Sequence, residues 1–297
     1  MKSQTGIKTS WTDVVSLGGV PNSDKLKNHL LEIHKLNAGF TENCSQLSRD
    51  SEGRNTYEWL AEVIDRKKHH KIVDLGCGSG FLLNLCNKKF HAGLSLTGVD
   101  MSSEELALAR EKLPPSVKLY KGLAQDLNFI KNEFVDVILC HWALTLMDSV
   151  ELVLSEIKRV LKTKGVFAAI VDGDSSESEQ YCEINEIIYR SVEKKCSNYR
   201  SVELGDIRIR SKKSLMDLLS NFFPISNIKI QSQVFKLYGE PEYLAKEVMG
   251  FYYACFLLPE DEYLELLVEL AVYFKNNRGE KTPVFCMPVN RVLISAT

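Results

Sequence analysis

The chain has 297 residues, of which 44% are hydrophobic and 26% charged, and its 37 basic and 39 acidic side chains leave a formal net charge of -2. This balance is ordinary for a folded protein and provides no general attraction for nucleic acid or for an anionic membrane. The longest apolar runs are too short to span a bilayer, and the polar start MKSQTGIKTSWTDVV lacks the apolar core of a secretory signal. We therefore expect no membrane segment.

Eight cysteines are spread along the chain without a C-x-x-C pair. Several lie within apolar runs, where a reduced cysteine packs as a small core residue. The pattern predicts neither a disulfide framework nor a zinc site, so no metal is expected. It favours a cytoplasmic location.

The first part of the chain is expected to be a polar arm followed by helices. Residues 1–22 are polar and rich in Gly, Ser and Thr, which predicts a loose arm. Apolar residues at helical spacing predict a helix over 23–39 that stops at Gly39 and a second helix over 55–66.

From residue 71 onward, apolar strands alternate with helices. The expected strands are 71–76, 94–100, 117–122, 134–144 and 164–173, and the expected helices are 79–90, 102–113 and 149–161. This alternation predicts βαβ units, and hence a mostly parallel sheet with helices on both faces. After Gly173 the rhythm changes, with helices expected over 176–196 and 241–276 and strands over 226–239 and 282–297.

A glycine-rich turn, DLGCGSG, follows the first of these strands and contains Gly76, Gly78 and Gly80. Glycines permit a left-handed turn and let a ligand approach the backbone closely. The dinucleotide fingerprint G-x-G-x-x-G would need glycine at 81 or 83, where Phe81 and Leu83 stand. No Gly-Lys-Ser/Thr follows, so the turn is not a nucleoside triphosphate loop either.

Two acids follow the next two strands. Asp100 ends the second strand, about 20 residues beyond the glycine turn, where a carboxylate accepts hydrogen bonds from both hydroxyls of a ribose. This acid occurs in several classes of nucleotide-binding protein and does not by itself decide the ligand. Asp126 follows the third strand and is placed either to accept from an adenine amine, with Leu127 against the ring, or to cap a helix.

Together these segments resemble the class I S-adenosylmethionine-dependent methyltransferases. VDLGCGSG is similar to that family's first motif, GVDMS to its ribose-binding segment and AQDL to its adenine-binding segment. FVDVILCHWALTLM is similar to its fourth-strand motif, and EIKRVLKTKGVFAAI to the end of its common core. The matches cover residues 58–172 in the family's order.

The resemblance implies a cofactor, S-adenosyl-L-methionine, and a role for each matching residue. Asp74 would lie near the methionine amino group, the three glycines would line the methionine and ribose, and Met101 would touch the adenine. Cys140 and His141 would border the sulfonium and the acceptor, although Cys140 equally suits the core. Arg54 is a further residue that we expect to reach the cofactor carboxylate.

The methyl acceptor is less clearly indicated. The fourth strand ends in CHWA rather than the Asn/Asp-Pro-Pro-Tyr/Phe tetrapeptide of enzymes that methylate exocyclic amines and amides. His141 could act as a general base, or it could be a histidine packed at a strand end. The stretch IRIR would place Arg208 and Arg210 on one face if it were extended, either to receive an anion or as a solvated edge.

These observations predict an α/β protein with a Rossmann-like, mostly parallel seven-stranded sheet and helical insertions forming a lid. The expected parts are an N-terminal region (1–57), a cofactor-binding core (58–174), and a remainder (175–297) with lid insertions near 175–205 and 240–282. The aromatic stretch YLAKEVMGFYYACFLLP would either roof an acceptor pocket or form core between helices. The favoured function is methylation of a small organic molecule, with nucleic acid as an unlikely partner. RNA or protein methylation, and cofactor binding without catalysis, stay open, and oligomeric state is not predicted.

Overall fold

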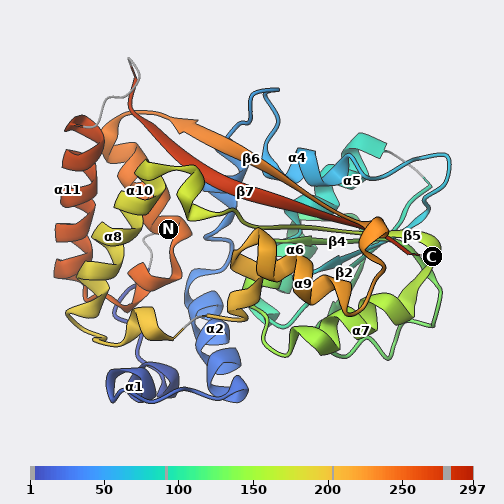
Figure 1. The fold of residues 1–297 in the computed structure, drawn as a ribbon, viewed down its shortest axis with the longest axis horizontal. Helices are drawn as coiled ribbons and strands as arrows, with labels where there is room; N and C mark the ends of the chain where they lie inside the picture. Colours follow the sequence, from blue (N-terminus) through green and yellow to red (C-terminus); the bar gives the residue numbers. More distant parts are fainter. Residues whose placement is uncertain (1–3, 91–92, 203, 277–281, 297) are drawn as a thin grey trace. The chain divides into compact units, whose positions relative to one another are not determined.

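The computed structural model describes residues 4–90, 93–202, 204–276 and 282–296 (Figure 1). They form two compact units, each assembled from segments that are distant in sequence. Unit 1 comprises Met1–Asn55, Ser175–Glu203 and Val234–Pro288, and unit 2 comprises Thr56–Asp174, Leu204–Gln233 and Val289–Thr297. Residues 203 and 277–281, which belong to the predicted lid ranges, lie outside the described residues.

The sheet has seven strands in the order β3-β2-β1-β4-β5-β7-β6. Its strands are β1 (Lys71–Leu75), β2 (Ser95–Asp100), β3 (Lys118–Lys121), β4 (Val135–His141), β5 (Leu161–Asp172), β6 (Ile228–Tyr238) and β7 (Val284–Ser295). The first five pair in parallel, and β7 runs antiparallel to β5. The division between the units falls within β6 and β7. The predicted α/β fold with a mostly parallel seven-stranded sheet is confirmed.

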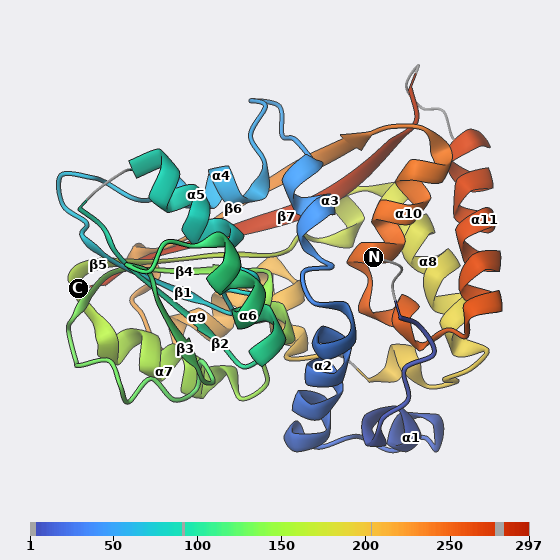
Figure 2. The same ribbon diagram turned by 180° about the vertical axis from the view of Figure 1, so that it is seen from behind.

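The helices of unit 2 follow the predicted alternation, and Figure 2 shows α5 and α6 from behind. They are α4 (Thr56–Ala61), α5 (Phe81–Phe90), α6 (Ser103–Lys112), α7 (Val150–Val160) and α9 (Lys212–Ser220). On one face of the sheet, apolar side chains of α7 and α9 form a common core with strand residues such as Val73, Ile138 and Phe167. Since the central strand β4 is buried on both faces, its nearly continuous apolar sequence is explained.

Unit 1 is mainly helical. Its helices are α1 (Ser10–Ser16), α2 (Ser23–Asn37), α3 (Glu42–Leu47), α8 (Glu179–Glu193), α10 (Pro241–Phe251) and α11 (Glu260–Asn276). Local sequence starts several of them: the Asn22 side chain accepts from the backbone N–H of Lys25 (3.0 Å), and the Ser178 side chain accepts from Tyr181. Among the described residues, no helix is both long and apolar enough to cross a membrane.

The predicted loose arm is wrong over residues 10–16, and its residues 1–3 lie outside the described residues. Residues 10–16 form helix α1, and its side chains Trp11 and Val15 are almost completely buried. Trp11 stacks on the ring of His29 from α2, with ring centroids 4.7 Å apart. The polar composition of this segment concealed the two apolar residues that dock it.

The predicted helix over 55–66 is shorter than expected, because α4 ends at Ala61. The carbonyl of Trp59, which would accept the next helical hydrogen bond, instead accepts one from the buried guanidinium of Arg291 on β7. The same guanidinium lies 4.4 Å from the Trp59 ring and donates to Gln231 on β6. A residue more than 200 positions away in sequence therefore ends this helix and fastens it to the sheet.

The aromatic stretch in 241–258 is mostly core. Met249, Tyr252, Cys255 and Phe256 are buried within unit 1, and Tyr253 bonds through its hydroxyl to His34 (2.8 Å). This favours the second of the two interpretations of that stretch, namely that its side chains pack between helices.

Candidate cofactor and methyl-transfer site

The strand order reverses direction between β1 and β4. From β1 the chain builds outward through β2 and β3, whereas from β4 it builds the other way through β5. The loops that leave the carboxyl ends of β1 and β4 therefore diverge, and in open α/β sheets ligands bind in the crevice at this position. In unit 2 those two loops are the glycine turn and the segment that follows His141.

The glycine turn has a left-handed backbone at Gly76, Gly78 and Gly80, with φ of 67°, 50° and 81°. At Gly76 a Cβ atom would lie 2.3 Å from the Cβ of Ala143, so the loops after β1 and β4 touch there. At Gly78 a Cβ would meet nothing closer than 3.8 Å, which leaves the backbone open on that side. The first glycine permits close packing of two loops, and the second leaves room for a ligand.

Asp100 connects the turn to the end of β2. Its Oδ2 accepts a hydrogen bond from the backbone N–H of Gly78 (2.8 Å), and its Oδ1 accepts one from that of Ser102 (2.8 Å). Each carboxylate oxygen has a second lone pair, so the group can also accept from two ligand hydroxyls. Asp100 is thus in direct contact with the glycine turn, and its predicted role of holding ribose hydroxyls stays a prediction.

Asp74 lies at the carboxyl end of β1 and is 1% exposed. Among the described residues its Oδ1 has no hydrogen-bond partner. Burial, together with the charge of Asp100, raises the pKa of Asp74 well above its usual value. A buried carboxyl group of this kind is suited to an ammonium group, because a cation would compensate the cost of burying its charge.

His141, the last residue of β4, is held by α4. Its Nε2 lies 2.8 Å from Oγ1 of Thr56, and its ring stacks on that of Tyr57 at a centroid distance of 3.7 Å. Tyr57 in turn contacts Phe81, the first residue of the helix that follows the glycine turn (4.5 Å). The three rings connect the end of β4 with the start of α5.

Burial lowers the pKa of His141 to about 3, so the ring is neutral and a weak base at physiological pH. This disfavours the general-base interpretation, which stays a prediction. The next residue, Trp142, has a left-handed backbone (φ 60°), which is uncommon for a bulky side chain and concentrates at functional sites. Cys140 is buried, and burial raises the pKa of its thiol. A buried thiol with a raised pKa is suited to core packing rather than to reaction as a thiolate.

Sequence patterns missed the residues that hold His141. Thr56 and Tyr57 lie in a short helix 85 positions earlier, and neither belongs to a recognisable motif. Thr145, in the segment after β4, is a further buried polar residue whose Oγ1 lacks a hydrogen-bond partner among the described residues. Only the fold brings these side chains to the carboxyl edge of the sheet.

Three further predicted cofactor residues lie near this edge. Met101 directly follows Asp100 and is partly buried. Asp126 is exposed, and its carboxylate accepts from the backbone N–H of Asn128 (3.3 Å), so it stabilises a turn. Leu127 is completely buried. Contact of these residues with a ligand stays a prediction.

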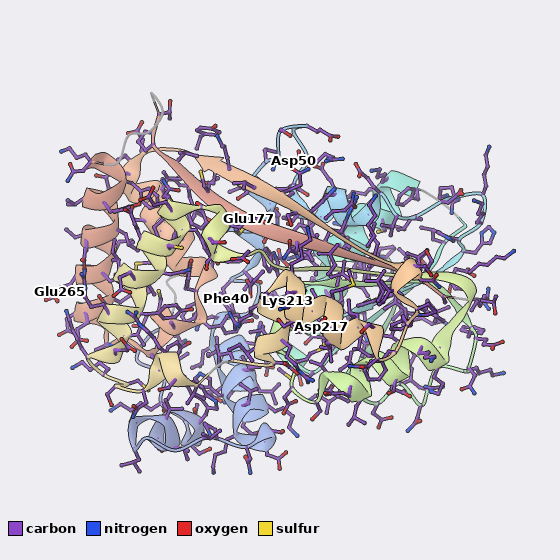
Figure 3. All side chains as sticks on the ribbon, viewed as in Figure 1. Phe40, Asp50, Glu177, Lys213, Asp217 and Glu265 are labelled. Carbon is purple, nitrogen blue, oxygen red and sulfur yellow. The ribbon has the colours of Figure 1, made fainter. Side chains whose placement is uncertain are left out.

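Arg54, which belongs to unit 1, is engaged by two acids. Its guanidinium pairs with the buried carboxylate of Asp50, which Figure 3 labels (2.7 Å), and with Glu52 (2.9 Å). These contacts hold the pKa of Asp50 below its usual value despite burial. The proposed contact of Arg54 with the cofactor carboxylate therefore stays a prediction that these ion pairs do not favour.

The IRIR stretch is not extended. Residues 207–210 form a 3₁₀ helix, so the condition under which both arginines would share one face of an extended segment is not met. Asp206 starts this turn by accepting from the backbone N–H of Arg208, and the Arg208 side chain pairs with Asp206 and with Glu151 (2.6 Å). Arg210 pairs with Asp172 (3.3 Å). Both arginines are thus neutralised by acids of their own unit.

The strand order and topology define a Rossmann-like α/β fold. Residues 73–169 match a family model described as "Methyltransferase domain". Among solved structures, the chain is similar to the YcgJ protein of Bacillus subtilis (TM-score 0.52, 18% identity, covering 81% of this chain and 97% of that one). It also resembles a Haemonchus contortus phosphoethanolamine N-methyltransferase (TM-score 0.54, 15% identity, 91% and 60% covered). At these identities the likeness shows the fold alone.

A curated relative is the demethylmenaquinone methyltransferase of Symbiobacterium thermophilum, with 34% identity over 118 residues (38% of this chain, 46% of the relative). Another is the malonyl-[acyl-carrier protein] O-methyltransferase of Pectobacterium atrosepticum, with 29% identity over 145 residues (48% and 53%). The chain spans about half the length of these relatives. The family match, the relatives and the fold agree in supporting a class I S-adenosylmethionine-dependent methyltransferase domain around residues 73–169.

Proposed function

We propose that the protein transfers a methyl group from S-adenosyl-L-methionine to a small organic molecule. The observation that carries the proposal is the carboxylate of Asp100, which the Gly78 N–H holds beside an open stretch of backbone. With the buried, unpartnered Oδ1 of Asp74, this edge offers acceptors for two ribose hydroxyls and for an ammonium group. Those are the polar groups that the cofactor would present, so the residues fit it.

The cofactor, when bound, supplies an electrophilic methyl group on a sulfonium. The protein's part is to position the two reactants: Asp100 and the glycine turn would hold the nucleoside, and Asp74 the amino acid end. The segment after β4, with the His141 and Tyr57 rings, would form the acceptor side. Because near-attack positioning can provide much of the rate enhancement, the weak basicity of His141 is compatible with transfer to an acceptor that needs no strong base.

Two observations favour a small organic acceptor over RNA. The named relatives are a demethylmenaquinone methyltransferase and a malonyl-[acyl-carrier protein] O-methyltransferase, so their acceptors differ and support a class rather than a compound. The arginines of the IRIR stretch, which would have been the phosphate-binding footprint, are paired with Asp206, Glu151 and Asp172. Six of the eight cysteines are buried as core residues, which suits a reducing compartment such as the cytoplasm.

Calorimetry with S-adenosylmethionine, S-adenosylhomocysteine and NAD tests the cofactor assignment. We expect binding of the first two and none of NAD, and an absence of heat with both sulfur compounds would refute the proposal. Incubation of a metabolite extract with methyl-labelled cofactor then tests the acceptor class. Label in low-molecular-weight organic products supports it, whereas label confined to RNA or protein contradicts it. Binding without any labelled product would favour a non-catalytic cofactor-binding protein.

A further inference from the structure

Helix α11 has two apolar faces. Leu266, Leu270 and Phe274 are spaced four residues apart and are buried in unit 1. Leu264, Val268 and Val272 have the same spacing but are 48%, 63% and 50% exposed. Each exposed residue lies two positions from a buried one, which is roughly 200° around a helix, so the two rows occupy nearly opposite sides.

The exposed row is unusual for a surface helix. Single exposed apolar side chains are common, but a surface helix normally carries polar residues opposite its core face. Here three apolar side chains follow one another over three successive turns. We call Leu264, Val268 and Val272 the outer stripe. A second apolar side of this kind is typical of a helix that packs on two sides.

Charges continue the outer stripe at both ends. Asp261 precedes Leu264 by three positions and Lys275 follows Val272 by three, and both are exposed. The N-terminal turn is acidic, with Glu260, Asp261 and Glu262, whereas the last turn carries Lys275. The order Asp–Leu–Val–Val–Lys is therefore symmetrical about Val268 in spacing and opposite in charge.

This pattern is complementary to itself in the antiparallel direction. A two-fold axis at Val268 would place Leu264 against the partner's Val272, and Asp261 against the partner's Lys275. Such an isologous contact uses the same surface on both copies, as dimers with two-fold symmetry do. A parallel arrangement would instead oppose Asp261 to Asp261 and Lys275 to Lys275.

We propose that the outer stripe is the centre of an antiparallel α11–α11 contact between two copies of this chain. The occupant is a second copy because the charge pattern matches its own reverse. An anionic lipid surface fits less well, since the acidic first turn would be repelled by it. A contact built on one helix pair is small, so the dimer is weak and depends on protein concentration. The proposal is independent of methyl transfer.

The first test is sedimentation velocity of the full chain over a wide range of protein concentration. We expect a reversible shift from one to two copies, and Val268→Glu should weaken dimerisation more than about tenfold because it opposes two carboxylates at the axis. The matched control is Val20→Glu, since Val20 is a valine of the same unit with 85% exposure. Circular dichroism melting confirms that both variants fold. A parent that is monomeric at every concentration, or a Val268→Glu variant that dimerises like the parent, overturns the proposal.

The second test is a charge exchange that reports the direction of pairing. Asp261→Lys and Lys275→Asp should each weaken the dimer, and the double variant should restore it. Unchanged affinity in all three variants contradicts the antiparallel contact. A monomeric parent that cosediments with phosphatidylserine vesicles through Val268 would likewise overturn it, as a lipid contact. In Figure 3, Glu265 marks α11, the helix that carries these positions.

Discussion

Two histidines, one in each unit, have nearly the same neighbours, although His29 is fully buried and His141 only partly buried. In unit 1, Nδ1 of His29 lies 2.9 Å from Oγ1 of Thr9, and its ring stacks on Trp11. In unit 2, Nε2 of His141 lies 2.8 Å from Oγ1 of Thr56, and its ring stacks on Tyr57. Burial lowers the pKa of His29 to about 4 and that of His141 to about 3.

The difference between the two is their place in the fold. His29 lies within a helical unit, where it joins α1 to α2, whereas His141 ends a central strand beside the glycine turn. A hydrogen bond to a threonine hydroxyl, a stacked aromatic ring and a lowered histidine pKa are therefore not signs of catalysis in themselves. Both histidines are held in this way, and only the position of His141 at the carboxyl edge of the sheet distinguishes it as the functional candidate.

The largest expected effect concerns the polar edge of unit 2. Asp100→Ala should weaken S-adenosylhomocysteine binding by at least about 100-fold, because each hydrogen bond to a charged group is worth about 1.5–3 kcal/mol and two hydroxyls lose theirs. Calorimetry measures the affinity. The control is Asp217→Ala, an exposed acid on α9 that Figure 3 labels. Near-normal affinity in a folded Asp100→Ala variant would refute the ribose assignment.

Alanine substitutions at glycines of both units distinguish the cost of backbone strain from the cost of a steric clash. Gly76→Ala combines a left-handed backbone with a clash against Ala143, so it should lower the unfolding free energy by about 2–4 kcal/mol. Gly78→Ala and, in unit 1, Gly53→Ala meet no close atom and should cost only about 1–2 kcal/mol from strain. Chemical denaturation measures the three.

Ligand affinity then distinguishes the two milder variants. Gly78→Ala should lose cofactor binding, because its Cβ would occupy the open side of the turn, whereas Gly53→Ala should keep it. Equal affinities for these two variants would show that a ligand does not approach Gly78.

His29 should make stability depend on pH. Its folded pKa of about 4 lies below the ordinary 6.5, so between these values the unfolded chain binds more protons and stability falls as pH falls. Relative to His29→Gln, the parent should lose about 3 kcal/mol from pH 6.5 and above down to pH 4. Chemical denaturation of both proteins at a series of pH values measures this change in unfolding free energy. Parallel pH profiles for the two proteins would contradict burial of a neutral His29, and methyl transfer should be unchanged in the variant.

The smallest expected effect tests the two threonines directly. Thr56→Val and Thr9→Val each remove a hydroxyl that contacts a histidine ring and should cost about 1 kcal/mol of stability. Only Thr56→Val should also reduce methyl transfer, by about tenfold at unchanged cofactor affinity, because a misplaced ring alters positioning. Thr56→Ser should restore the rate. If both valine variants kept full activity, the Thr56–His141 contact would be no more than structural.

Much of unit 2 was predictable because its signals are local. Strands β1 to β5 and helices α5 to α7 lie where periodicity predicts them, since each element carries its own apolar pattern. The place of Asp100 at the end of β2 was predictable for the same reason, whereas its contact with a ribose stays a prediction. By contrast, α1 depends on the stacking of Trp11, the early end of α4 on Arg291, and the 3₁₀ turn at 207–210 on Asp206. A pattern of apolar periodicity does not reveal the partners of these side chains.

The sequence by itself determined the fold class, the register of the glycine turn and the cofactor family, because short-range patterns encode strands, turns and the groups that line them. Only the tertiary structure decided which buried groups meet. Thr56 reaches His141 across 85 residues, Arg291 reaches Trp59 across 232, and the arginines of the IRIR stretch find acids on other elements. Hydrogen bonds and ion pairs between distant segments follow no fixed sequence spacing. They can therefore be identified only once the folded chain brings the two segments together.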